Sequence, residues 1–399
     1  MAGGRINIIV AANNKGAVTR LVAEYANHLT KCGYDVTVSY PAFNYWHNYL
    51  WQLRDIPNSR LVPHFQDLRR IIYPLLKYFI WSLFQKNRWL GEKIYEIDGQ
   101  VEMNPYLFVP TGWNMPDADY IICLQEYIIP QLLYLPKSKG EIIGSIHLDY
   151  MNGINDSNKG TSEWWKYVVE IDRKVNVPTW TTSRRSLESC EKLGIRVDRL
   201  IYNGVDANLL SDGNRRGRIK PLRLMLYCDS RPNKGRASGV SVVRKLKEIY
   251  PPEDVIFCSL GEIPGDESAY FDINLGFLHG NEYIESYRKS DIFLFPSLYE
   301  GFPAPPLDAM ACGCALVTTK VPGVEDYAEH GINCMLSEPA DEEAMIHNIK
   351  LLIDDQALRD RLRENGLATV KRLSWDKSTE ELIKFINETT SKVPIPDHT

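Results

Sequence analysis

The sequence lacks several features that define large classes of proteins. None of its eight cysteines forms a CxxC pair, and several lie in apolar runs, where a free thiol packs as a small hydrophobe. This scatter indicates a reduced, cytoplasmic compartment and no disulfide framework. Cys312 and Cys314 leave a zinc site open as an alternative.

Long hydrophobic runs are also missing. No stretch reaches the roughly 20 apolar residues of a membrane-spanning helix, and the polar N-terminus does not have the pattern of a signal peptide. The nearest candidate is residues 69–90, RRIIYPLLKYFIWSLFQKNRWL, with Pro74, Lys77 and Gln85 inside it. Three interpretations stay open: a peripheral contact with the inner face of a membrane, a cover over an acceptor groove, or a buried amphipathic helix.

The common nucleotide-binding loops are absent as well. The first strand–helix loop has no GxGxxG pattern and the chain has no GxxxxGK[ST] P-loop, so a nicotinamide cofactor is poorly supported. A net charge of -5 argues against general binding of nucleic acid. We therefore expect neither a cofactor nor a nucleic-acid partner.

What the chain does contain is a repeated alternation of strands and helices. Ile6–Ala11 is a short apolar strand, Val18–Lys31 has the spacing of a helix that ends before Gly33, and Val36–Ser39 is the next strand. This order predicts a parallel sheet covered by helices. Further strands are expected at 119–124, 142–147 and 179–182, the last followed by a helix ending near Gly194.

The same alternation starts again after Gly204. The polar, glycine-rich stretch 203–220 has the composition of a linker, and 399 residues are too many for one ordinary core. We therefore predict an α/β protein with two Rossmann-like doubly wound domains facing each other across a cleft. Their expected limits are 1–203 and 204–372, followed by a C-terminal helix at 373–392. The second series comprises strands at 223–228, 255–259, 291–296 and 315–319 and helices at 238–249, 282–289 and 306–311.

The stretch Ser297–Gly313, SLYEGFPAPPLDAMACG, is the most informative part of the sequence. A strand ends at Pro296, and a tight turn follows with Glu300, Gly301, Phe302 and Pro303. A helix is expected to begin near Pro305 or Pro306, where free backbone N–H groups and the helix dipole favour an anion. Asp308, placed in the first helical turn, can bind vicinal hydroxyls such as those of a ribose. An acidic residue that merely favours the dipole is the structural alternative.

Other candidates lie at the ends of neighbouring strands. Arg231 and Lys234, in CDSRPNKG, could neutralise a diphosphate leaving group, although a solvated basic loop has the same sequence. His147 closes the strand that begins at residue 142 and could face a ligand, or be a structural histidine. Gly16 lies in the first strand–helix loop, where the backbone would pass close to a ligand.

A metal site has one further candidate. Asp117 and Asp119 have the spacing of paired aspartates that bind divalent cations in one class of glycosyltransferase. However, Asp119 precedes an apolar strand just as Asp291 does in the second half. We interpret both as acids at the entry of a strand and predict no metal.

The second half of the chain resembles the family 4 retaining glycosyltransferases of the GT-B fold. The resemblance covers about half of the chain, and in the first half only the loop around Gly16 and His147 match. It is carried by Asn203-Gly-Val-Asp206, Arg231, Lys234-Gly235, Phe277-Leu-His-Gly280, Tyr287–Ser297, Glu300-Gly-Phe302, Ala309–Gly313, Pro322-Gly-Val-Glu325 and Ser374-Trp375.

The resemblance implies a role for each matched residue. Arg231 and Lys234 would hold the diphosphate of a nucleotide sugar, and Asp308 would bind its ribose. Glu300 would contact the donor sugar, with Gly301 and Phe302 offering backbone groups and His147 nearby. The partners implied are a nucleotide sugar and a glycan or lipid-linked acceptor, in polysaccharide biosynthesis.

The chain departs from the family pattern at three places. Asp308 stands where the family has Glu, the spacing from Arg231 to Lys234 is short, and Pro303 replaces a small residue in the sugar pocket. These departures leave two alternatives open: a nucleotide-sugar epimerase or phosphorylase on the same fold, and a degenerate transferase that binds nucleotide sugars as a scaffold.

Overall fold

The computed structural model describes residues 4–10, 17–41, 100–106, 113, 115–125, 128–147, 150–151, 165–166, 168–170, 172–206, 209–210 and 220–390. Contacts divide the chain into two compact units. Unit 1 is Met1–Ser145 with Lys174–Pro178, and unit 2 is Ile146–Arg173 with Thr179–Thr399. The predicted domain limits stay predictions. Gly16, residues 69–90 and most of the expected linker lie outside the described residues.

The first sheet contains the strands predicted in the first half of the chain. Its order is β3-β2-β1-β4-β5-β6-β7, and β1, β2, β3, β4 and β5 pair in parallel. Its strands are β1 (Arg5–Ile9), β2 (Asp35–Pro41), β3 (Glu102–Tyr106), β4 (Tyr120–Cys123), β5 (Glu141–Ile146), β6 (Thr179–Thr181) and β7 (Arg199–Leu200).

Short helices accompany these strands. They are α1 (Ala17–Lys31), α5 (Ile129–Leu132), η2 (Lys137–Lys139) and α8 (Arg184–Lys192). Gly33, with φ of 89°, ends α1 as expected, because its N–H donates to Thr30 O at 2.9 Å in a conformation that glycine adopts without strain. In α8, the Ser183 side chain accepts the N–H of Ser186 and caps the helix.

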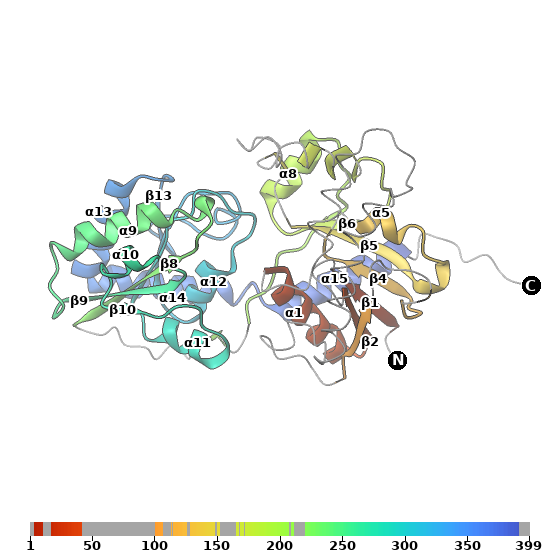
Figure 1. The fold of residues 1–399 in the computed structure, drawn as a ribbon, viewed down its shortest axis with the longest axis horizontal. Coiled ribbons are helices and arrows are strands. Elements are labelled where there is room, and N and C mark those ends of the chain that lie inside the picture. The colour runs from red at the N-terminus through yellow and green to blue at the C-terminus, as the bar shows by residue number, and fades with distance from the viewer. Residues whose placement is uncertain are drawn as a thin grey trace, which may run out of the picture. The chain divides into compact units, whose positions relative to one another are not determined.

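Unit 2 is built around a second parallel sheet (Figure 1). Its order is β10-β9-β8-β11-β12-β13, with every neighbouring pair parallel, which confirms the predicted doubly wound pattern. The strands are β8 (Leu222–Cys228), β9 (Val255–Gly261), β10 (Ile273–Asn274), β11 (Ile292–Phe295), β12 (Ala315–Thr319) and β13 (Met335–Ser337). The helices are η4 (Pro232–Lys234), α9 (Arg236–Lys247), α10 (Gly265–Ser268), α11 (Gly280–Arg288), α12 (Ala304–Ala311), α13 (Glu342–Asp354), α14 (Gln356–Val370) and α15 (Trp375–Thr390).

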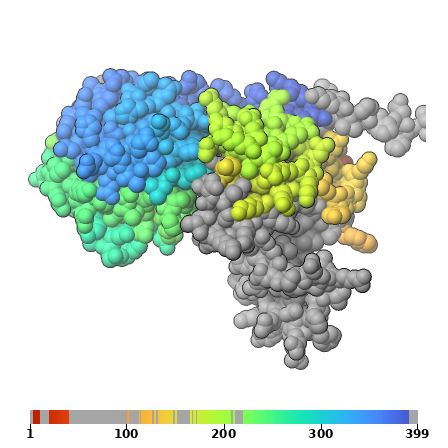
Figure 2. All heavy atoms as spheres, turned by 90° about the horizontal axis from the view of Figure 1, so that it is seen from above, coloured from red at the N-terminus to blue at the C-terminus, as the bar shows by residue number. Residues whose placement is uncertain are grey.

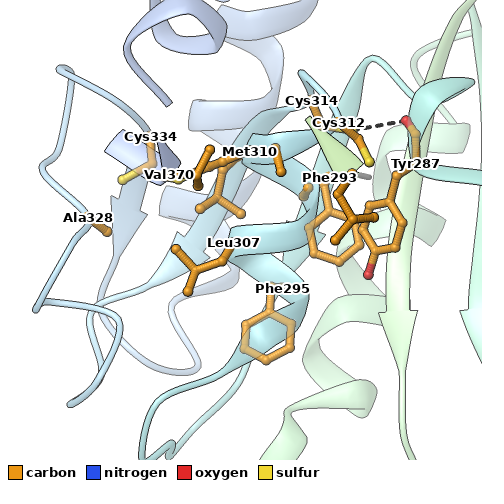
Figure 3. Close-up of a cluster of buried hydrophobic side chains, with 14 of the residues drawn as sticks. Tyr287, Phe293, Phe295, Leu307, Met310, Cys312, Cys314, Ala328, Cys334 and Val370 are labelled. Atoms are coloured by element: carbon orange, nitrogen blue, oxygen red, sulfur yellow. Dashed lines mark hydrogen bonds between the residues drawn. The ribbon is translucent and has the colours of Figure 1, made fainter. Parts of the chain in front are cut away.

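The two faces of this sheet bury different apolar clusters, because successive strand residues point to opposite sides. In β11, Ile292 and Leu294 join a cluster with α9 and α13. Phe293 and Phe295 join the other cluster, which includes Leu307 and three further residues of α12. Figure 3 shows these rings beside α12. Helix α12, which follows the turn at Glu300, is thereby fixed against the sheet.

The C-terminal helix begins at Trp375, two residues after the predicted start. Val205 N donates to Leu373 O at 2.6 Å, and a Cβ on Gly204 would lie 2.2 Å from Trp375 N. Farther along α15, Phe385 contacts the ring of Trp180 at 6.5 Å. Trp375 and Phe385 of α15 are therefore anchored inside unit 2, whose described residues are coloured yellow through blue in Figure 2.

Within the described parts of the chain, we find no helix with the length and apolar character needed to cross a bilayer.

Candidate functional site

The loop after β8 lies directly against the end of β11. Gly235 has φ of 64°, and a Cβ at this position would lie only 1.9 Å from Pro296 O, so only glycine allows this approach. Leu298 N also donates to Asn233 O at 2.8 Å. These contacts place the loop with Arg231 and Lys234 beside the turn with Glu300.

Two of the predicted site residues form a buried ion pair. Lys234 Nζ donates to Glu300 Oε1 at 2.6 Å and to Oε2 at 2.8 Å, and the two side chains are only 12% and 7% exposed. The Ser297 hydroxyl lies 2.6 Å from Glu300 Oε1 and donates to it. Such charge-assisted bonds fix both groups at the carboxyl ends of β8 and β11.

Arg231 has a different partner within its own loop. Its Nε donates to Asp229 Oδ1 at 2.9 Å and its Nη2 to Oδ2 at 2.6 Å, a bidentate pair. The Arg231 side chain is 63% exposed. The hydrogen bonds and charge of Asp229 raise the pKa of Arg231. The structure therefore brings Lys234, and not Arg231, into contact with Glu300.

The turn at Gly301 is packed backbone to backbone. A Cβ on Gly301 would lie 2.7 Å from His147 O, and one on Gly323 would lie 1.8 Å from Gly301 O. Gly323 has φ of 78°, which strains any other residue. The backbone of His147 therefore lies next to the turn, while its place near a donor sugar stays a prediction. Burial lowers the pKa of His147 to about 4, which keeps its ring neutral near pH 7.

Phe302 and Pro303 continue the turn among aromatic rings. The Phe302 ring stacks on Tyr202 at 5.5 Å between centroids and meets the edge of Tyr327 at 5.6 Å. The Tyr327 hydroxyl donates to Pro303 O at 3.4 Å. These rings hold Phe302 against the core, so its backbone groups are fixed in position.

The start of α12 corrects the expectation for Asp308. The helix begins at Ala304, and no acidic residue lies in its first turn, so Asp308 is its fifth residue and lies in the second turn. Pro303 is the N-cap without a side-chain cap. Proline has no N–H, so Ala304 supplies the only backbone donor between Pro303 and Pro306. The helix start offers fewer amide donors to an anion than predicted.

Asp308 is held by a tyrosine instead of by the helix start. Its side chain is almost completely buried, with the residue 1% exposed. The Tyr283 hydroxyl of α11 donates to Asp308 Oδ2 at 2.8 Å. This contact, together with the position in the second turn, argues against the interpretation of Asp308 as a residue that favours the dipole.

The charges of Glu300 and Asp308 both affect the pKa values of the same two tyrosines. Burial raises the pKa of Tyr227 to about 12, and the charges of Asp229, Glu300 and Asp308 contribute to the same shift. Burial and both acids also raise the pKa of Tyr327. Glu300 and Asp308 thus create a shared negative potential, which Arg231 opposes at Tyr227.

Several residues of this arrangement were missed by sequence reasoning. Gly323 belongs to the quoted Pro322-Gly-Val-Glu325 motif, so a signal for it existed. Asp229 and Ser297 lie inside quoted motifs but were given no role, and Tyr202 and Tyr283 match no pattern that we used. Each is recognised only by the side chain it contacts in the folded chain.

The acids considered for a metal have structural partners. Asp119 Oδ2 accepts Arg5 N at 2.6 Å, and Asp291 Oδ2 accepts Arg223 N at 2.9 Å. The interpretation of both as strand-entry acids is confirmed. Asp117 pairs with Lys139 at 2.8 Å. In the described residues, no group of three or more His, Cys, Asp or Glu side chains is arranged to hold a metal ion.

The site lies partly in a segment that matches a known family. Residues 273–369 match the model of the family described as "Glycosyl transferases group 1". This segment of the chain is similar to the group 1 glycosyltransferases. The matched segment contains Glu300, Gly301 and Asp308, while Arg231 and Lys234 precede it.

Curated relatives match the chain over short segments. Over 109 residues it is 30% identical to the O-antigen chain mannosyltransferase B of Escherichia coli, covering 27% of this chain and 28% of that protein. It is 28% identical over 119 residues to the capsular polysaccharide biosynthesis glycosyltransferase CapM of Staphylococcus aureus, covering 29% and 31%. Both matches span less than a third of the relatives.

Solved structures extend the likeness in fold. The sucrose-phosphate synthase of Thermosynechococcus elongatus has a TM-score of 0.67 at 14% identity, covering 98% of this chain and all of that one. HepE of Anabaena, solved in complex with UDP-glucose, has a TM-score of 0.63 at 15% identity with the same coverage. These neighbours confirm the GT-B fold.

Proposed function

We propose that this chain transfers a sugar from a nucleotide-diphosphate sugar to a hydroxyl of a glycan, glycolipid or other acceptor, with retention of configuration and without a metal. The buried pair of Lys234 and Glu300 carries this proposal. It places a cation and a carboxylate together at the carboxyl ends of β8 and β11, where doubly wound sheets bind their ligands.

The cations would act on the leaving group. As the bond to the anomeric carbon breaks, negative charge grows on the diphosphate, and Lys234 Nζ and the Arg231 guanidinium can stabilise it. Lys234 is held in place by two bonds to Glu300, so little reorganisation is needed. Arg231 is exposed and can turn a donor edge toward a phosphate.

The acids and the turn would orient the donor. Glu300 would contact the sugar and Asp308 the ribose, while Gly301 and Phe302 present backbone groups beside His147. In the retaining route that we propose, the acceptor hydroxyl attacks the anomeric carbon from the same face that the diphosphate leaves, and its proton passes to the departing phosphate oxygen. We assign no carboxylate as a covalent nucleophile.

The acceptor and the location belong to the same proposal. The named relatives act in O-antigen and capsule biosynthesis, which favours a glycan or lipid-linked acceptor. We place the enzyme in the cytoplasm, and a peripheral contact of residues 69–90 with the inner face of the membrane stays open beside the acceptor-groove and buried-helix alternatives. Flotation with anionic liposomes tests this contact, and a chain that stays at the bottom of the gradient contradicts it.

A panel of labelled nucleotide sugars tests the function. We expect slow hydrolysis of one donor by the purified chain, abolished in Glu300→Ala and retained in Glu282→Ala, a control on the exposed side of α11. An isomeric nucleotide sugar as product would favour an epimerase. Binding without turnover, even with membrane extracts as acceptor, would indicate a scaffold and overturn the proposed transfer.

A further inference from the structure

The hydroxyl groups of two tyrosines form a hydrogen-bonded series that ends at the carboxylate of Asp308. Tyr283 donates its proton to Asp308 Oδ2 at 2.8 Å, and its oxygen lies 3.0 Å from the hydroxyl of Tyr287. A phenol has one proton. Because the proton of Tyr283 is directed at Asp308, the proton between the two tyrosines comes from Tyr287.

The surroundings of Tyr287 agree with its role as the donor to Tyr283. Tyr287 is fully buried, and its ring packs against Tyr283 at 4.9 Å and Phe293 at 5.1 Å between centroids. Burial, followed by the charges of Tyr283 and Asp308, raises the pKa of Tyr287. Tyr287 therefore stays protonated and donates, which strengthens the bond from Tyr283 to the acid.

This hydrogen-bonded series restricts how the carboxylate of Asp308 can rotate. The last torsion of an aspartate side chain is broad, so the carboxylate plane is free to rotate unless a contact fixes it. Asp308 lies in the second turn of α12. The hydroxyl of Tyr283, from α11, holds Oδ2 and so restricts rotation of the carboxylate.

On the basis of the proposed function, we infer that Tyr283 is a positioning residue for recognition of the nucleotide ribose, and that it orients the Asp308 carboxylate toward the vicinal hydroxyls. A carboxylate that is already oriented loses less conformational freedom when the ligand binds. Because the proton of Tyr283 is used by Asp308, its effect on the ribose is indirect.

The test pairs a variant with a change in the ligand. Tyr283→Phe keeps the ring and removes the hydroxyl. Binding of UDP and GDP, each beside its 2′,3′-dideoxy counterpart, is measured by calorimetry. In the unmodified chain, we expect the preferred nucleotide to bind about tenfold tighter than its dideoxy form, since hydrogen bonds to a charged group are lost. In Tyr283→Phe, this ratio should fall below about threefold.

Two further variants separate positioning from a general loss of structure. Tyr270→Phe changes a tyrosine that packs on the opposite face of the sheet, and it should leave the ratio unchanged. Asp308→Asn keeps the shape and removes the charge, and it should reduce the ratio as Tyr283→Phe does. Thermal unfolding checks that each variant is folded.

The outcomes distinguish the two proposals. An unchanged ratio in a folded Tyr283→Phe, with normal binding by the unmodified chain, overturns the role of Tyr283 and leaves the proposed function intact. If Tyr283→Phe does not fold, an unchanged ratio in Asp308→Asn overturns the inference. If the unmodified chain binds no nucleotide, both the inference and the proposed function fail.

Discussion

The two cations of the loop after β8, Arg231 and Lys234, form different kinds of ion pair. Arg231 forms a pair with Asp229, two residues away, and remains 63% exposed. Lys234 forms a pair with Glu300, which is 66 residues away in the sequence, and both side chains are almost buried. Two cations three positions apart thus belong to one local and one long-range interaction.

This difference predicts different energetic roles. An exposed ion pair contributes little to stability because water screens it. A buried pair is expensive to break, since the remaining charge is left without compensation. Lys234 and Glu300 should therefore be coupled in both folding and chemistry, whereas Arg231 should act mainly on the ligand.

The largest expected effect comes from Lys234→Ala. Removing a preorganised charge from the leaving group should reduce turnover by on the order of 10²-fold or more. The same change leaves Glu300 buried and unpaired, so the free energy of unfolding should fall by about 3 kcal/mol. Donor hydrolysis and urea unfolding measure the two effects, with the exposed Lys289→Ala as control. Turnover equal to that of the control would refute the assignment of Lys234.

Double-mutant cycles compare the two pairs directly. For Lys234→Ala with Glu300→Ala, we expect a coupling of about 2 kcal/mol in unfolding free energy, because the double variant leaves no lone buried charge. For Arg231→Ala with Asp229→Ala, the coupling should stay below about 1 kcal/mol. Equal coupling in the two cycles would show that burial does not distinguish the pairs.

Arg231→Ala alone should have a smaller effect that depends on salt. We expect nucleoside diphosphate affinity to fall by about tenfold at low ionic strength, and the difference from the unmodified chain to shrink as salt is added, because exposed charges are screened. Unfolding should change little. A loss of affinity that does not vary with salt would contradict the exposed position of this guanidinium.

The sequence predicted more of the fold than of these contacts. Nearly continuous apolar residues in Leu222–Cys228 and Ile292–Phe295 predict buried parallel strands, and successive residues then face the two clusters, so the second sheet follows from local pattern. The pairing of Lys234 with Glu300 depends on how two loops meet, which no local pattern contains. From the proline residues at 303, 305 and 306 we predicted a helix start near Pro305 or Pro306. The helix begins at Ala304, because the tertiary contacts of the turn set its start.

In the candidate site, too, local sequence motifs could be predicted and tertiary contacts could not. Glu300, Gly301 and Lys234 were identified from motif spacing, and the structure brings them together. Tyr283 was not identified, because its role depends on the side-by-side placement of α11 and α12. Asp229 precedes Arg231 in the sequence, but two residues of opposite charge at this spacing form a bidentate pair only in the right loop conformation.

The smallest effect concerns Asp229→Asn and acid. Burial opposes ionisation of Asp229, but its hydrogen bonds with Arg231 and the charges of Arg231 and Lys234 lower its pKa overall. A lowered pKa means that the unfolded chain takes up this proton at a higher pH than the folded chain, so the pair stabilises the fold above the unfolded value near 3.8 and loses this contribution as pH falls below it. Unfolding of Asp229→Asn should therefore be less sensitive to pH between about 5 and 2 than that of the unmodified chain. Identical pH dependence in the two proteins would mean that even this local pair contributes nothing to the folded state, and the contrast with Lys234 and Glu300 would be greater still.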